Sequence, residues 1–129
     1  METQEDEIVA LERAALVRWC QGDPSGFLEI SAPDVAYFDP FVAHRLDGLE
    51  ALTGYYEGLR GRISASRWKI VAPKVQRAGD VAVLTFQFLS WGGSENALRW
   101  NCTEVYRRAA GRWSIIQTHW SFAAASTGA

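Results

Sequence analysis

Residues 81–91 read VAVLTFQFLSW, and this stretch decides the fold class. Apolar and aromatic side chains fill it without a proline or glycine, which is typical of a β-strand. Similar patterns lie on both sides of it, at residues 67–77, 97–108 and 112–122. Turns that contain glycine separate these segments at 78–80, 92–94 and 109–111. We therefore expect an antiparallel meander over the second half of the chain.

The first half of the chain carries the periodicity of helices. A helix is predicted over residues 4–20, where apolar residues recur at three- and four-residue steps: Ile8, Leu11, Ala15, Leu16 and Trp19. Asp23 can cap, and Pro24 can open, a short second helix that reaches residue 30. A strand over residues 34–39 then stops at Pro40, and a third helix follows over residues 47–60.

Helices followed by a meander predict an α+β domain, with three helices packed on one face of a strongly curved, mostly antiparallel sheet. The length of 129 residues suits a single domain, and we expect residues 123–129 to be a disordered tail. Both faces of the late strands carry large apolar groups, although helices can cover only one of them. We therefore expect a homodimer through the outer, convex face. A closed barrel with a thick core is the alternative.

Composition narrows the classes of function. A hydrophobic content of 48% and a net charge of −2 are ordinary for a soluble protein, and no basic run indicates nucleic acid as a partner. No apolar run suits a membrane span, and the acidic N-terminus is unlike a signal peptide. We expect a cytoplasmic protein with buried, reduced thiols at Cys20 and Cys102. His44 and His119 lack the neighbours that a metal site needs, so neither a metal nor a cofactor is expected.

Asp39 is the strongest candidate for a functional residue. It ends the predicted strand and stands directly before Pro40. A carboxylate there either begins a turn or lies at the mouth of a pocket, where it can transfer protons. Arg99 could pair with it and fix it as a structural anion. The sequence leaves these interpretations open.

Several segments together resemble nuclear transport factor 2-like proteins, and most nearly their SnoaL-like and ketosteroid isomerase-like branches. The resemblance covers about residues 5–122 and rests on the order of four segments: WCQGD at 19–23, APDVAYFDP at 32–40, GLEAL at 48–52 with Tyr55 and Tyr56, and GRWSIIQTHWS at 111–121. It implies a conical fold in which helices close a curved sheet over a deep pocket, usually in a dimer. That superfamily contains enzymes, ligand-binding proteins and assembly domains, so the fold does not name the function.

The resemblance also implies roles for single residues. Asp39 matches the general base of ketosteroid isomerases. The tyrosine and the protonated aspartate that stabilise the enolate in those enzymes correspond to Ala15 and Thr103. Both oxyanion donors are therefore missing, and steroid isomerisation by that route is not expected. Arg99 and Asn101 resemble the Arg-x-Asp motif of limonene epoxide hydrolases, with an amide in place of the acid.

Strand alternation and the match of Trp120 to the pocket wall of the superfamily predict the lining of the pocket. We expect Asp39 to transfer a proton, and Arg99 and Asn101 to stabilise developing negative charge. The other residues of the predicted site should contact a small, partly apolar organic molecule: Tyr37, Tyr55, Thr85, Gln87, Trp91, Thr103, Thr118 and Trp120. This set favours an isomerase, cyclase or hydrolase that needs no cofactor. The alternative is a non-catalytic ligand-binding or assembly domain.

Overall fold

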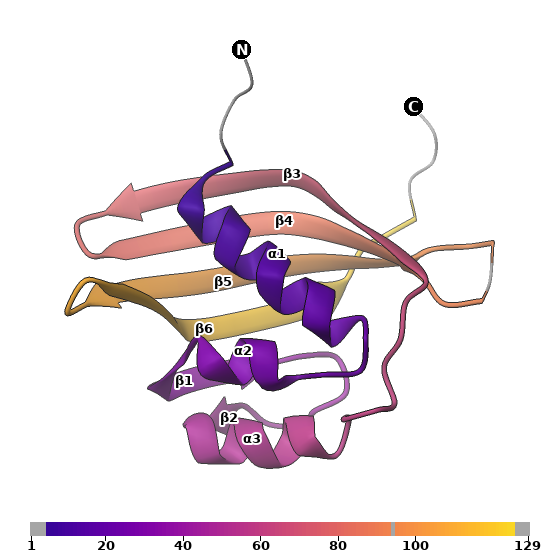
Figure 1. Cartoon of the computed structure of the whole chain (residues 1–129), viewed down its shortest axis with the longest axis horizontal. Helices are drawn as coiled ribbons and strands as arrows, with labels where there is room; N and C mark the ends of the chain where they lie inside the picture. Colours follow the sequence, from indigo (N-terminus) through magenta and orange to yellow (C-terminus); the bar gives the residue numbers. More distant parts are fainter. Residues whose placement is uncertain (1–4, 94, 126–129) are drawn as a thin grey trace.

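The computed structural model describes residues 5–93 and 95–125 (Figure 1). The elements follow in the order α1 (Glu7–Trp19), α2 (Ser25–Glu29), β1 (Ser31–Phe38), β2 (Leu46–Asp47), α3 (Leu49–Glu57), β3 (Arg67–Ala78), β4 (Val81–Trp91), β5 (Leu98–Ala109) and β6 (Arg112–Phe122). The predicted α+β class is confirmed. The short strand β2 was not predicted. The last part of the predicted disordered tail, residues 126–129, lies outside the described residues.

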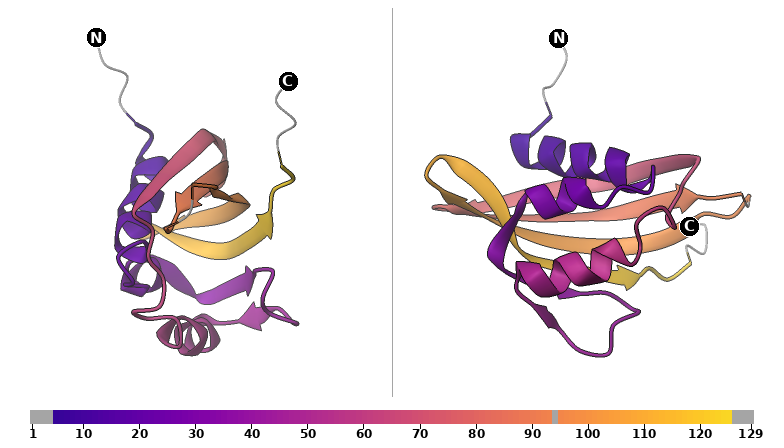
Figure 2. Two further views of the ribbon diagram at one scale, coloured as in Figure 1. Left: turned by 90° about the vertical axis from the view of Figure 1, so that its right-hand side faces the viewer. Right: turned by 60° about the horizontal axis from the view of Figure 1, so that its bottom comes forward.

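The strands form one open sheet in the order β2-β1-β6-β5-β4-β3. Strands β3 to β6 pair antiparallel with their neighbours, as a meander does, whereas β1 lies parallel to β6. The sheet is strongly curved, and the helices lie along one side of it (Figures 1 and 2). Because the sheet is not closed, the alternative of a closed barrel is wrong. No helix of the described part of the chain is long and apolar enough to cross a membrane.

Helix α1 packs against the concave face of the sheet through the stripe that its periodicity predicts. The Asp6 carboxylate caps the helix by accepting a hydrogen bond from the backbone N–H of Ile8 at 2.8 Å. Ile8 and Leu16 are fully buried in the core. Burial removes the apolar surface of each side chain from water and stabilises the folded protein by about 2 kcal/mol for each one.

A backbone junction ties the end of α1 to the loop that follows α3. The carbonyl of Gly22 accepts a hydrogen bond from the N–H of Gly61 at 2.9 Å, and the carbonyl of Cys20 accepts one from Ala65 at 3.1 Å. Gly22 has a φ of +87°, and a Cβ there would lie 3.2 Å from backbone atoms of Gly61 and Ile63. Only glycine therefore suits this position without strain.

A β-bulge in β6 decides which residues face the helices. The pairing with β5 shifts between Val105 and Tyr106, which leaves Ile116 as the extra residue on β6. Ile115 and Trp120 therefore share the concave face, although simple alternation would place them on opposite faces. The concave residues of β5 that pair with this strand are Trp100, Cys102, Glu104 and Tyr106.

We predict that Gly22→Ala lowers the free energy of unfolding by about 1–3 kcal/mol, because the added methyl group meets backbone atoms at a strained φ. Urea denaturation measures the change. Gly54→Ala in α3 is the matched control, since a Cβ there has no neighbour within 4 Å, and it should stabilise the helix by about 0.5–1 kcal/mol. Equal effects of the two substitutions would contradict the role of the junction.

Candidate functional site

A cavity of about 460 Å³ lies between α1, α3 and the concave face of the sheet. This volume is within the range of pockets that hold small organic molecules. Its walls are rich in aromatic side chains, among them Trp19, Tyr37, Tyr55, Phe88, Trp100 and Trp120. The rings contact one another edge to face, for example Trp100 and Trp120 with centroids 5.9 Å apart. Such contacts hold the walls in fixed orientations.

Asp39 lies in the cavity wall directly after β1, and its carboxylate accepts four hydrogen bonds. The phenol groups of Tyr37 and Tyr55 donate to Oδ2 at 2.8 and 2.5 Å. The backbone N–H groups of Phe41 and Val42 donate to Oδ1 at 2.7 and 3.2 Å. Asp39 therefore stabilises the turn at Pro40 and also lies in the cavity wall. Both interpretations of this residue agree with the geometry.

The two tyrosines are held as neutral donors. Burial, the neighbouring Tyr56 and the Asp39 carboxylate raise the pKa of Tyr37 far above its usual value. Burial and the hydrogen bond to Asp39 raise the pKa of Tyr55 as well. Both phenols therefore stay protonated at every physiological pH.

Arg62 supplies a positive charge to the cavity lining, which sequence reasoning did not single out. It lies in the loop after α3 and is exposed. Among residues 5–93 and 95–125, its guanidinium has no hydrogen-bond or ion-pair partner. The hydroxyl-bearing residues Ser64 and Ser90 also belong to the lining. Nothing in the sequence distinguished Arg62 from other loop arginines, because its place depends on how the loop docks.

Several predicted site residues do come together. Tyr37, Asp39, Tyr55 and Trp120 all line the cavity. Thr118 lies on the same face and is buried, but it does not belong to the lining, and its hydroxyl donates to a carboxyl group deeper in the core.

The predicted orientation of Arg99, Asn101 and Thr103 is wrong, because all three lie on the outer face of β5. Their neighbours Trp100 and Cys102 face the cavity and the core instead. A change of register by one residue moves every side chain of a strand to the other face. The observed register removes large apolar side chains from water, whereas the expected one would have buried a guanidinium and an amide.

The residues predicted on β4 follow the same pattern. Thr85 pairs with Thr103, and Gln87 donates a hydrogen bond to the Asn101 side chain at 3.0 Å on the outer face. Trp91 lies under the guanidinium of Arg67, 4.3 Å from the ring centroid, and likewise does not line the cavity. The pairing of Arg99 with Asp39, which the sequence left open as an alternative, is absent from the described structure, where tyrosine hydroxyls and backbone amides satisfy the carboxylate.

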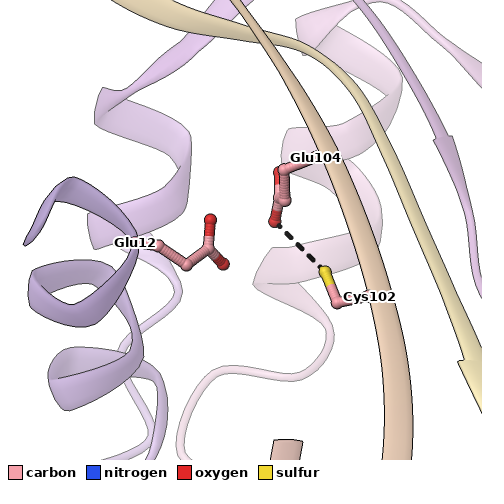
Figure 3. A group of neighbouring side chains, drawn as sticks. All are labelled: Glu12, Cys102 and Glu104. Carbon is pink, nitrogen blue, oxygen red and sulfur yellow. Dashed lines mark hydrogen bonds between the residues drawn. The ribbon is translucent and has the colours of Figure 1, made fainter. Parts of the chain in front are cut away.

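Two buried carboxyl groups, Glu12 of α1 and Glu104 of β5, were also missed (Figure 3). A signal for them exists in the sequence. Glu12 stands four residues from both Ile8 and Leu16 in the apolar stripe of α1. Glu104 alternates with the inward-facing Cys102 and Tyr106 of β5.

A curved sheet closed by helices over an aromatic cavity defines the nuclear transport factor 2-like class of proteins, and the resemblance seen in the sequence is confirmed. Within that class, the family model of the calcium/calmodulin dependent protein kinase II association domain matches residues 4–124. The chain therefore belongs to this family.

Solved structures agree with this assignment. A candidate ketosteroid isomerase from Parabacteroides distasonis ATCC 8503 is 44% identical, with a TM-score of 0.82 over 90% of this chain and 85% of that chain. A nuclear transport factor 2-like protein from Pseudomonas putida KT2440 is 26% identical, with a TM-score of 0.80 over 95% and 87%. The CaMKII hub of S. rosetta is 19% identical, with a TM-score of 0.74 over 95% and 100%, and shares the fold. No curated protein matches the chain.

We predict that Asp39→Asn lowers the free energy of unfolding by about 1–3 kcal/mol. An amide has one oxygen, so it can accept from the two phenols or from the two backbone N–H groups, but not from both pairs. Chemical denaturation measures the loss. Asp47→Asn is the control, since that exposed carboxylate pairs only with Arg45 among the described residues, and it should cost less than about 1 kcal/mol. Asp39→Asn that is as stable as this control would count against the four-donor arrangement.

Proposed function

We propose that this chain is a small-molecule-binding domain whose ligand occupies the aromatic cavity. The size of the cavity and its few polar groups among apolar walls support this proposal. The observation that carries it is the Arg62 guanidinium, which lines the cavity without a protein partner in the described structure. A free cation beside aromatic walls is a recognition group that the fold itself does not use.

The polar groups indicate the chemistry of the ligand. Asp39 already accepts four hydrogen bonds, so it offers a ligand no vacant oxygen. Arg62 offers up to five N–H donors and a positive charge. The complementary molecule has a flat apolar body and carries an anionic or strongly accepting group at the end that reaches Arg62.

Proton transfer by Asp39 is the function that the geometry supports less well. A general base has to come within hydrogen-bond reach of the proton that it removes. The two phenols of Tyr37 and Tyr55 already occupy Oδ2, so a substrate would have to displace one of them. In the proposed binding domain, Asp39 instead holds the two tyrosines in place as parts of the wall.

We predict that Arg62→Gln weakens the binding of an aromatic anion, anilinonaphthalene sulfonate, by about tenfold, because a charge-assisted contact is lost. Binding of phenylnaphthylamine, a neutral probe of similar shape, should change less than about twofold. Quenching of tryptophan fluorescence measures both affinities, since Trp19, Trp100 and Trp120 line the cavity.

Lys74→Gln is the matched control for the loss of one charge, because Lys74 is exposed on β3 and does not line the cavity. It should leave both affinities unchanged. If both variants weakened binding equally, the effect would depend only on the net charge of the protein and not on the position of Arg62. If neither probe quenched the tryptophans, the proposal of a ligand-binding cavity would be contradicted.

We also propose that the domain forms a homo-oligomer through the outer face of its sheet, as expected from the sequence for a homodimer. Membership of an association-domain family supports this second function. So does the outer face itself, where the half-buried apolar residues Val83, Leu89 and Val105 lie beside exposed Asn101 and Thr103. A mixed surface of this kind is usual for an interface between subunits that fold by themselves.

We predict that the wild-type chain sediments with at least twice its monomer mass of 14.4 kDa, and that Thr103→Arg shifts it toward the monomer. Thr103 is exposed at the centre of the outer face, between Thr85 and His119, so an arginine there opposes association without disturbing the core. Glu50→Arg on α3 is the control and should leave the assembly intact. A wild-type monomer at micromolar concentration would refute the proposal.

A further inference from the structure

Two carboxyl groups meet in the core, away from the lining of the cavity. Glu12 projects from α1 and Glu104 from β5 into the same part of the core, and both residues are fully buried. Together with the thiol of Cys102, each offers an atom that lies within 4.8 Å of the others (Figure 3). None of the ion pairs among residues 5–93 and 95–125 includes either glutamate.

Three of the four carboxyl oxygens have a donor. The Tyr106 hydroxyl donates to Oε1 of Glu12 at 2.7 Å. The Thr118 hydroxyl donates to Oε2 of Glu104 at 2.8 Å, and the Cys102 thiol donates to Oε1 of Glu104 at 3.8 Å. The remaining oxygen, Oε2 of Glu12, is buried and has no partner among the residues that the structure describes. An unpartnered oxygen on a carboxyl group that lies beside a second carboxyl group is the mark of a shared proton.

The energetics lead to the same conclusion. Two ionised carboxylates without a cation would carry a large desolvation cost and would repel each other at close range. A proton on one of them removes one charge and supplies the missing donor for the other. Burial raises the pKa of Glu12 to about 7. Burial and the neighbouring Glu12 raise the pKa of Glu104 well above its usual value. The pair therefore titrates as a unit and keeps a proton at neutral pH.

A divalent cation suits this cluster less well than a proton. Tyr106, Thr118 and Cys102 all point a hydrogen at the carboxyl oxygens, and a metal would require those donors to turn away. Coordination by Cys102 would also need a thiolate. Burial and the two glutamates raise the pKa of that thiol well above its usual value.

We propose that the proton shared by Glu12 and Glu104 latches α1 to the sheet, and that the latch opens as the pH rises through the neutral range. The other titratable groups that face the pair are Cys102 and Tyr106 on β5 and Tyr56 on α3. Their pKa values are all raised by burial, so they stay neutral over this range. Strand β6 contributes the hydroxyl of Thr118. Opening separates the two carboxylates by lifting α1, because β5 is fixed on both sides by its neighbours.

The sign of the pH dependence follows from the raised pKa. Folded Glu12 holds its proton more tightly than unfolded Glu12, whose pKa is about 4.5. The stabilisation from this group is therefore complete below about pH 4.5 and is lost as the pH rises through about 7. A carboxylate that pairs with a cation has a lowered pKa, so the stabilisation that it contributes is lost as the pH falls instead.

The test compares melting temperatures at about pH 6 and about pH 8.5 with a chelator present. The wild-type protein should melt at least about 5 °C lower at the higher pH. The double variant Glu12→Gln with Glu104→Gln has no proton to lose and should show no such fall. Glu50→Gln removes an exposed carboxylate of α3 instead and should keep the wild-type response. A flat wild-type response, or a double variant with the full response, would overturn the latch.

A second measurement does not depend on the variants folding. Infrared spectroscopy of the wild-type protein at about pH 6 should show the carbonyl stretch of a protonated carboxylic acid, because exposed acids are ionised there. The band should disappear over the pH range in which the melting temperature falls. Its absence would overturn the proposal. So would a rise in melting temperature on adding Zn²⁺ without chelator that Glu12→Gln abolishes, since the cluster would then hold a metal.

Discussion

The concave face of the sheet has to be kept from water by three helices, and they are too short to fill it. Helix α1 has 13 residues, α2 has 5 and α3 has 9, while the longer strands have 11 or 12. The curvature of the sheet brings its two ends toward the helices, and Tyr37 of β1 packs against Tyr55 and Tyr56 of α3 across the space between sheet and helix. What they leave unfilled is the cavity. The pocket thus follows from a mismatch in length between helices and strands.

The polar groups in this apolar interior are satisfied in two ways. At the cavity wall, both oxygens of Asp39 are satisfied by phenol and backbone N–H donors. Deeper in, Glu12 and Glu104 have fewer donors than oxygens, and a proton makes up the difference. The second arrangement depends on pH through the shared proton. A single small core therefore combines a fixed wall with a pH-sensitive contact.

The sequence predicted the class of fold well, because the apolar periods of the helices and the four late strands are strong local signals. Tyr37, Asp39, Tyr55 and Trp120 line the cavity, and their positions depend on element order, while their roles toward a ligand stay predictions. Arg99 and Asn101 were misplaced because register is a collective property of paired strands. Arg62 depends on loop docking, and Glu12 with Glu104 depends on partners far apart in the chain, so no local pattern could join them. The α1 stripe and the β5 alternation did mark each glutamate separately as inward-facing.

The bulge at Ile116 gives the gene for this domain a point of tolerance. Removing that one codon would restore strict alternation in β6, since Gln117 would still pair with Val105 and Thr118 with Glu104, and every other side chain would keep its face. A strand without such an extra residue cannot absorb the loss of one codon, because every later side chain then moves to the other face. A designer who wished to shorten β6 and keep the cavity wall would therefore begin at this residue.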